Sequence, residues 1–196
     1  MLAVKKYPKS RFVPLSQVEL EQVWQWRNQD EIRRNMHNDA NISWQQHLAW
    51  FEQLQTNPKR LFFVFYQDER AIGVLNFNQR AINEWEWGCY LGENNVWPGS
   101  GLLLEIAALD YAAAQTKLEL LYAEVLSFNH SVIKMHQIFG YQALPDLPGK
   151  TRDNQPYTVK TFQYPLAQWR ANRTLILQRL PKQISAAADF ISFLNQ

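Results

Sequence analysis

Two glycines, Gly99 and Gly101, stand in a turn between an apolar run typical of a strand and an apolar run typical of a helix. At such a turn several backbone N–H groups and the helix dipole point to one place, which favours an anion. Glycine there lets a phosphate approach the backbone closely and tolerates a positive φ angle. The turn lacks the third glycine of a dinucleotide-binding loop and the Gly-Lys-Ser/Thr of a Walker loop. An ordinary strand-to-helix turn would look similar, but the remaining ligand class is another diphosphate, and coenzyme A carries one.

The elements before this turn can be predicted from capping signals. Ser16 and Ser43 each precede a Glu or Gln by three residues, which is the spacing of a capping box. Apolar residues then recur at helical intervals, so we expect one helix over about 17–28 and a second that Asn57-Pro58 ends.

The rest of the chain alternates between the two periodicities. Gln67-Asp68-Glu69-Arg70 separates two aromatic and β-branched runs, which indicates an antiparallel hairpin. We expect strands over 61–66, 71–77, 85–91, 120–126 and 158–164, and helices over 102–114 and 130–139.

This order of elements indicates an α/β or α+β layered fold, with a mixed central sheet flanked by helices. We expect one domain over residues 1–164 and a C-terminal helical extension over 165–196. In that extension, 166–180 and 184–194 have amphipathic patterns and Pro181 separates them. They could pack on the domain, on a second copy or on another protein, and the sequence does not choose.

Two motifs resemble the GNAT superfamily of N-acetyltransferases. Glu86–Leu91 lies five residues before Trp97–Gly101, as the central strand precedes the pyrophosphate loop in that family. Asn129–Tyr141 resembles the family's second signature, an Asn-led helix that closes on glycine and an aromatic residue. The resemblance implies the GNAT fold and acetyl-CoA as the cofactor. Val96 stands where the family commonly has Gln or Arg, so one customary contact of the loop is absent.

The resemblance also implies which residues hold the coenzyme. The backbone of Tyr90, Leu91 and Gly92 would face the pantetheine arm, which would lie along the strand as a partial extra strand. Lys134 would meet a coenzyme phosphate, although an exposed helix lysine would look the same. The full predicted set is Tyr90, Leu91, Gly92, Trp97, Gly99, Ser100, Gly101, Leu102, Asn129 and Lys134.

Acetyl transfer to an amine needs a neutral amine, a polarised carbonyl and a proton for the departing thiolate. His136 stands where the family commonly has a tyrosine acid, seven residues after Asn129. An imidazolium can protonate a thiolate, so the resemblance makes His136 the candidate general acid. Tyr141, Tyr90 or water remain alternative donors.

The resemblance makes Glu86 the candidate base, acting through a water, although a strand carboxylate in a salt bridge would look the same. Glu84 shares its face of the strand. A backbone N–H near Leu91 would polarise the carbonyl. Cys89 is the only cysteine, with no histidine near it in sequence to activate it, and we expect it to be a buried small hydrophobe. No metal is expected, because the histidines and Cys89 show no ligand spacing.

The sequence of the predicted N-terminal helices indicates the class of acceptor substrate. Trp24–Asn28, Glu31–Met36 and His47–Phe51 resemble the sugar-nucleotide N-acetyltransferases of pseudaminic acid biosynthesis, and the similarity runs over about 12–142. This resemblance implies acetylation of the 4-amino group of a UDP-4-amino-4,6-dideoxy sugar, with a place in flagellin glycosylation. A UDP-sugar offers uracil for stacking, a diphosphate for an arginine and hydroxyls for amides. The predicted substrate residues are Trp26, Arg27, Asn28, Asn78 and Trp87, with Arg33 and Trp44 as further candidates.

Three other functions stay open. The acceptor could be a protein N-terminal amine, as in the acetylation of ribosomal proteins, or an aminoglycoside, which as a polycation calls for an acidic pocket. The chain could also be a catalytically silent acyl-CoA-binding module that recruits a partner, because it lacks the usual tyrosine and the Gln or Arg of the loop.

Composition sets the remaining bounds. The net charge of +2 gives no reason to expect nucleic acid or an anionic membrane as partner. The sequence has no run of about 18 apolar residues and no signal-peptide core, so we expect a cytoplasmic protein with no membrane partner. The sequence leaves open whether the chain forms a homodimer.

Overall fold

The computed structural model describes residues 7–194. Its strands are β1 (Ser10–Pro14), β2 (Arg60–Gln67), β3 (Arg70–Ala81), β4 (Glu84–Leu91), β5 (Leu120–Leu126), β6 (Gln142–Arg152), β7 (Gln155–Pro165) and β8 (Ile191–Phe193). Its helices are α1 (Leu20–Arg27), α2 (Asp30–Arg33), α3 (Trp44–Thr56), α4 (Ser100–Ala114), α5 (His130–Phe139), α6 (Leu166–Gln178) and α7 (Lys182–Ala188).

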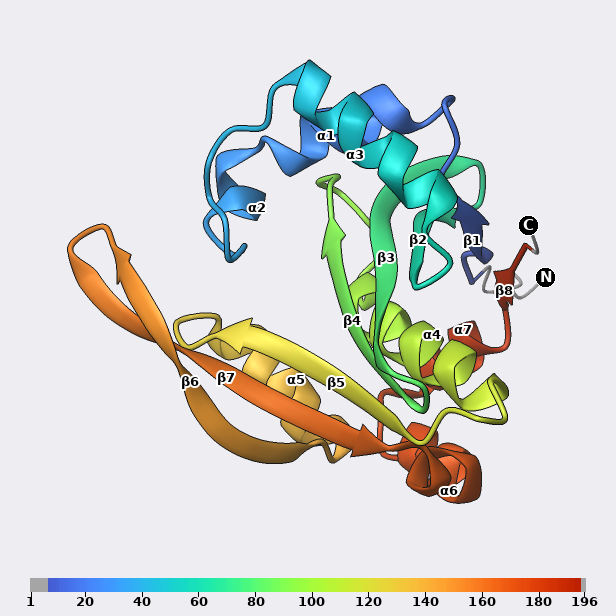
Figure 1. The fold of residues 1–196 in the computed structure, drawn as a ribbon. Helices are drawn as coiled ribbons and strands as arrows, with labels where there is room; N and C mark the ends of the chain where they lie inside the picture. Colours follow the sequence, from blue (N-terminus) through green and yellow to red (C-terminus); the bar gives the residue numbers. More distant parts are fainter. Residues whose placement is uncertain (1–6, 195–196) are drawn as a thin grey trace.

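The strands form one mixed sheet in the order β6-β7-β5-β4-β3-β2-β1-β8. Neighbouring strands are antiparallel except for the pairs β4–β5 and β1–β8, which are parallel. Figure 1 shows β4 and β5 diverging from a common end, with the α1–α3 region beyond the far end of β4 and the β6–β7 hairpin on the other side. The predicted layered α/β fold is therefore confirmed.

The sheet separates two apolar cores, because successive side chains of a strand point to opposite faces. In β2 and β3, Phe63 and Leu75 face the larger core, which α4, α6 and α7 complete. Val64 and Val74 face the smaller core with residues of α1 and α3. The same alternation along β4 places successive side chains on opposite sides of the site.

Capping explains where the N-terminal helices begin. The Ser43–Gln46 capping box forms in full and starts α3, as predicted. At the first box, the N–H and hydroxyl of Ser16 both donate to the Glu19 carboxylate, at 3.2 and 2.6 Å. The serine does not cap the N–H of Glu19, and α1 begins only at Leu20, later than the predicted residue 17.

Three strands, β1, β6 and β8, lie outside the predicted set, and β6 and β8 depend on a partner. β6 contains Pro145, Pro148 and Gly149, which disfavour a strand, and it pairs with β7 through two irregularities. The predicted helix over 184–194 is wrong in its second half, because Ile191–Phe193 adds to the edge of β1 as β8. The C-terminal segment is therefore not purely helical.

The C-terminal segment packs on the same core as α4. Leu166, Trp169 and Ile184 are at most 2% exposed. Trp169 donates its indole N–H to Asp110 of α4 at 2.8 Å. Ile184 fills the space beside Gly99, in the turn that starts α4. No helix within residues 7–194 has the length and apolar character needed to cross a membrane.

Candidate active site

The parallel pair β4 and β5 opens into a gap. The two strands pair only over Glu84–Glu86 and Leu120–Tyr122, although both continue for several residues. Beyond Glu86, the edge of β4 that faces β5 has no strand partner in the described part of the chain. Strand backbone groups need hydrogen-bond partners, so this edge can receive an extended ligand as an added strand.

The backbone at the end of β4 decides which groups face the gap. The Gly92 N–H donates to the Ile72 carbonyl at 2.9 Å, and the Gly92 carbonyl accepts from Gln29 at 3.1 Å. Both groups are occupied, so the predicted use of the Gly92 backbone by a ligand is not supported. Successive residues of an antiparallel ladder point to alternate edges, and Leu91 therefore directs its N–H and carbonyl into the gap.

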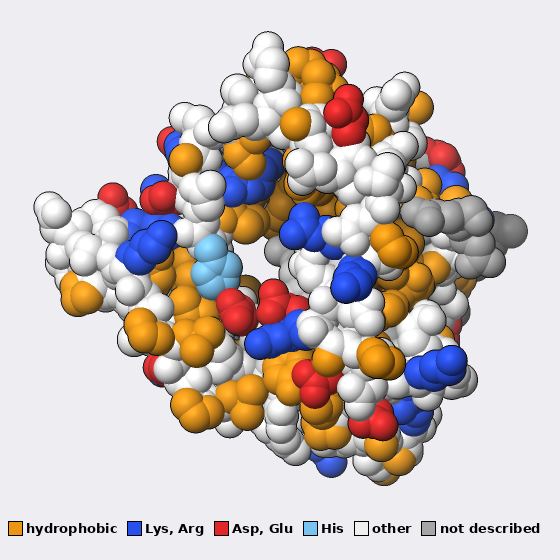
Figure 2. Space-filling model, viewed as in Figure 1, with side chains coloured by type: hydrophobic (Ala, Val, Ile, Leu, Met, Phe, Trp, Pro, Cys, Tyr) orange, Lys and Arg blue, Asp and Glu red, His pale blue; other side chains and the backbone are white. Residues whose placement is uncertain are grey.

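A cavity of about 700 Å³ occupies the gap and extends over the ends of both strands. Its wall includes Tyr90, Leu91 and Gly92 from the end of β4, Gly101 from α4 and Asn129 before α5. Figure 2 shows the molecule hollowed at this place, with basic, acidic and histidine side chains gathered around the opening. The strand gap and the turn before α4 thus belong to one site.

The glycine turn has the geometry expected of an anion site. Gly99 has a φ of +106°, and a side chain there would also collide with Ile184. At Gly101 an added Cβ would meet no atom within 4 Å, so the space in front of it is open. Within the described residues, the N–H groups of Gly101 and Leu102 make no hydrogen bond. These free donors start α4, where the helix dipole favours negative charge.

Three other predicted cofactor residues are placed away from the cavity wall. Ser100 is 1% exposed, and its hydroxyl is used by the Trp97 carbonyl and Gln67. Trp97 is partly buried beside Gly99. Lys134 is exposed on α5. The structure supports Ser100 and Trp97 as parts that shape the turn rather than as side chains directed at a ligand.

On the larger-core side of the gap, His136 lies in the cavity wall, although it is only 2% exposed. Its Nδ1 is 3.0 Å from Oε1 of Glu105, a fully buried carboxylate of α4. The ring packs edge-on against Trp87 and lies against Tyr141. The predicted acid therefore faces the gap from the side of α4 and α5, and Trp87 lies beside it.

On the smaller-core side, Glu86 and Glu124 lie in the cavity wall. Glu86 is 3.3 Å from Arg80, and Glu124 is 3.1 Å from His37. Burial raises the pKa of Glu86 and the charge of Glu124 raises it further, whereas Arg80 and His37 lower it. A carboxylate with a raised pKa and access to a cavity is suited to accept a proton.

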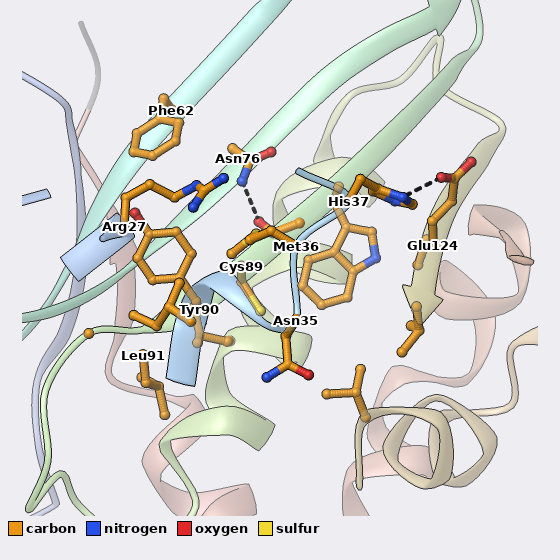
Figure 3. A pocket seen from close by; sticks show the side chains of 18 of the residues that line it. Arg27, Asn35, Met36, His37, Phe62, Asn76, Cys89, Tyr90, Leu91 and Glu124 are labelled. Atoms are coloured by element: carbon orange, nitrogen blue, oxygen red, sulfur yellow. Dashed lines mark hydrogen bonds and ion pairs between the residues drawn. The ribbon is translucent and has the colours of Figure 1, made fainter. Parts of the chain in front are cut away.

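Arg27 reaches into the same side of the cavity, near Tyr90 and Phe62 (Figure 3). One guanidinium nitrogen donates to the Asn38 carbonyl at 2.6 Å, while Nη1 is buried and finds no hydrogen-bond partner among residues 7–194. Burial lowers the pKa of Arg27, because the surroundings solvate its charge poorly. An anionic ligand group would satisfy this side chain. Asn78, another predicted substrate residue, also lies in the wall.

Four predicted substrate contacts are used within the protein instead, and none lies in the cavity wall. Trp26 is 1% exposed and donates its indole N–H to Glu93 at 2.8 Å. The Asn28 amide bonds both backbone groups of Ile42. Arg33 donates to the carbonyls of Asn28 and Asp39 and to Asp30, and Trp44 packs edge-on against Trp24. Asn28 and Arg33 thus stabilise the loop between α2 and α3, which sequence spacing could not reveal.

The comparisons with known proteins agree with this geometry. A family model described as an acetyltransferase (GNAT) domain matches residues 10–142. The chain belongs to the GNAT acetyltransferase family. Acetyltransferase PseH of Campylobacter jejuni is 30% identical over 126 residues, which are 64% of this chain and 78% of the relative. Spermidine N-acetyltransferase of Vibrio cholerae, solved with CoA and spermine, superposes with a TM-score of 0.76 at 14% identity, over 83% of this chain and 98% of that one. An N-acetyltransferase of Staphylococcus aureus Mu50 superposes with a TM-score of 0.66 at 17% identity, over 80% of this chain and 98% of that one.

This GNAT protein is an acetyl-CoA-dependent N-acetyltransferase. Its own residues fit the cosubstrate at two places. The unpaired edge of β4 can bond the pantetheine arm through Leu91, and the free N–H groups of Gly101 and Leu102 can meet phosphate oxygens. Acetyl-CoA supplies the activated acetyl group, as a thioester, to an amine in the cavity.

Three residues that line or support this GNAT site were not predicted from the sequence. Glu105 is a lone acid in an apolar helical run, which is a signal that could have been noticed. Glu124 alternates with apolar residues in β5, and His37 lies in a loop without periodicity. Cys89 lies in the cavity wall, and burial raises the pKa of its thiol to about 12, with Glu105 contributing. It is therefore held as a neutral thiol.

Replacing Gly101 by valine tests the anion site of the turn. The added side chain meets open space, so the free energy of unfolding should change by no more than about 1 kcal/mol. The same atoms would block phosphate oxygens from the free N–H groups, and calorimetry should show at least about tenfold weaker binding of CoA. Gln45→Val, in the first turn of α3 and exposed, is the control. Equal CoA affinity in both variants would contradict the assignment.

Proposed function

We propose that the enzyme transfers the acetyl group of acetyl-CoA to the 4-amino group of a UDP-4-amino-4,6-dideoxy sugar, as in pseudaminic acid biosynthesis. The observation that carries the proposal is the state of Arg27, which lies in the cavity wall. Its Nη1 is buried and makes no hydrogen bond within the described residues. An arginine in this state suits a diphosphate, since a guanidinium bonds phosphate oxygens in pairs. The relationship to PseH supports the same class of acceptor.

The smaller-core side of the cavity has groups that suit the rest of such an acceptor. Asn76 and Asn78 lie side by side on the face of β3 that carries Val74, and Asn76 donates to the Gly88 carbonyl at 2.9 Å. Amides of this kind can bond sugar hydroxyls. Phe62 and Tyr90 add aromatic surface near Arg27 (Figure 3). A polyamine or aminoglycoside would place its positive charge against this arginine, which disfavours both.

Glu86 is the proposed base. It lies on the acceptor side of β4 and, through a water, takes the proton that the amine loses as nitrogen bonds to the thioester carbonyl carbon. Its raised pKa makes it a better proton acceptor than an exposed carboxylate. The Leu91 N–H, which points into the gap, can donate to the carbonyl oxygen as negative charge develops there.

His136 is the proposed acid. As the carbon–sulfur bond breaks, the imidazolium gives a proton to the departing thiolate and remains as neutral imidazole. The alternative proton donor is the hydroxyl of Tyr141, whose ring packs against His136 in the larger core. Burial and then the charge of Glu105 raise the pKa of Tyr141 well above its usual value, which makes it the weaker acid.

The acceptor class is tested by CoA thiol release from acetyl-CoA with a panel of amines. We expect turnover with UDP-4-amino-4,6-dideoxy sugars, and none with short peptides, spermidine or an aminoglycoside, because only the first group offers a diphosphate to Arg27. Arg27→Gln should raise the KM for the sugar nucleotide about tenfold or more and leave that for acetyl-CoA unchanged. Turnover restricted to peptides would replace the proposal with protein N-terminal acetylation. CoA binding without turnover on any amine would indicate a silent binding module.

The base is tested by Glu86→Gln, with Glu84→Gln as the control on the same strand and face. A base must be deprotonated, so wild-type activity should fall as the pH is lowered through the raised pKa of Glu86. Glu86→Gln should reduce kcat by about 10²-fold and remove this acid limb of the pH profile. Glu84 lies outside the cavity wall and its variant should keep the limb. An acid limb that persists in Glu86→Gln would refute the assignment.

A further inference from the structure

A buried acid–histidine pair stands behind the cavity. Glu105 is the only charged residue between Gly101 and Leu109 of α4, and it is fully buried. Its Oε1 is 3.0 Å from Nδ1 of His136. Burying a carboxylate is unfavourable unless it is paired and hydrogen-bonded, and an apolar pair of similar volume often stabilises a core as well. Stability alone does not account for this pair.

The pair is also incompletely satisfied, unlike a purely structural network. The second carboxylate oxygen, Oε2 of Glu105, is buried and has no hydrogen bond of normal length within the described residues. The Tyr141 hydroxyl is buried close to it, near enough for Glu105 to raise its pKa as a charge and as a hydrogen-bond partner, and the buried indole N–H of Trp87 acts on the same hydroxyl. Polar groups in a core are held this way more often at functional sites than elsewhere.

The side chains that stack on the imidazole within the described residues are uncharged: Trp87 of β4, Tyr141 after α5 and Phe162 of β7. Cys89 of β4 and Tyr164 of β7 lie in the same core. Burial first, and then the charge of Glu105, raise the pKa values of Cys89 and Tyr164 to about 12, so both stay protonated near pH 7. Glu105 is thus the one anion that faces the ring within the described residues.

The contact also decides which nitrogen of the ring faces the cavity. Nδ1 is engaged by Glu105, and Nε2 lies on the opposite side of the ring. Nε2 makes no hydrogen bond within residues 7–194, and His136 forms part of the cavity wall. A carboxylate that accepts from Nδ1–H fixes this tautomer and the orientation of the ring.

We infer that Glu105 is a positioning residue that holds His136 by its Nδ1–H, with Nε2 directed into the cavity. This inference rests on the proposed role of His136 in acetyl transfer. The Nε2 proton moves to the CoA sulfur as the carbon–sulfur bond breaks, and the bonding electrons stay on sulfur until it is protonated. The ring remains neutral, bonded to Glu105, and takes a proton from water before the next turnover.

Glu105→Gln keeps the shape and an acceptor oxygen and removes the charge. The Gln amide can donate to Nδ1 as well as accept from it, so the ring is no longer held in one tautomer and kcat should fall about tenfold or more. The KM for acetyl-CoA should stay within about twofold, because Glu105 does not contact substrate. Glu52→Gln, an exposed position of α3, is the charge-matched control.

A double-mutant cycle separates positioning from a structural role. If Glu105 acts through His136, Glu105→Gln should lower kcat in the wild-type background and have no further effect on kcat in His136→Gln. An equal loss in both backgrounds would overturn the inference. A rise in the KM for acetyl-CoA as large as the fall in kcat would also overturn it, because it would indicate disturbed packing of the site.

Nitrogen-15 NMR of the histidine rings gives a readout that needs no turnover. The His136 signal, assigned by its loss in His136→Gln, should show a protonated Nδ1 at every pH of a titration in the wild type, and a larger share of the other tautomer at high pH in Glu105→Gln. If that variant does not fold, the wild-type tautomer decides: a His136 with an unprotonated Nδ1 overturns the inference. A wild type inactive on every amine would refute the proposed function, while this titration would still test the pair.

Discussion

The site depends on the divergence of two parallel strands. β4 and β5 hold each other through only three residue pairs and then part, which leaves one edge of β4 without a partner in the described chain. Backbone hydrogen-bonding groups are not left unsatisfied at low cost, so the fold must bring a ligand or water to that edge. The rest of the sheet, with antiparallel pairing on both sides of the gap, keeps the two strands apart and fixes the width of the opening (Figure 1).

The alternation of side chains along β4 then divides the chemistry between two faces. Trp87, Cys89 and Leu91 point to the larger core, where α4 and α5 contribute Glu105 and His136. Glu86 and Tyr90 point to the other face, where Arg27 enters from α1. The proposed acid, His136, and the proposed base, Glu86, thus reach the gap from opposite sides. The turn before α4 adds free N–H donors at the same opening, and α7 supports that turn through Ile184.

Much of this arrangement is local in sequence and could be predicted. The order of strand, glycine turn and helix, and the Asn-led helix that ends at Gly140, follow from periodicity and capping, and β5 and α5 have their predicted bounds. The rest depends on contacts between distant residues. Asn28 and Arg33 have the right side chains for a sugar nucleotide, but the backbone of the next loop takes their hydrogen bonds. Glu105 and His136, which form a pair, are 31 residues apart in the sequence. The strands β6 and β8 form because they pair with the free edges of β7 and β1.

Hydrogen–deuterium exchange with and without CoA tests most directly whether the gap between β4 and β5 receives the cosubstrate. Bound pantetheine should bond the exposed edge of β4, and phosphates should cover the first turn of α4. Peptides spanning 86–104 should therefore exchange more slowly with CoA present, while those of β1 and the β6–β7 hairpin should be unchanged. Slower exchange elsewhere, with 86–104 unaffected, would contradict the account.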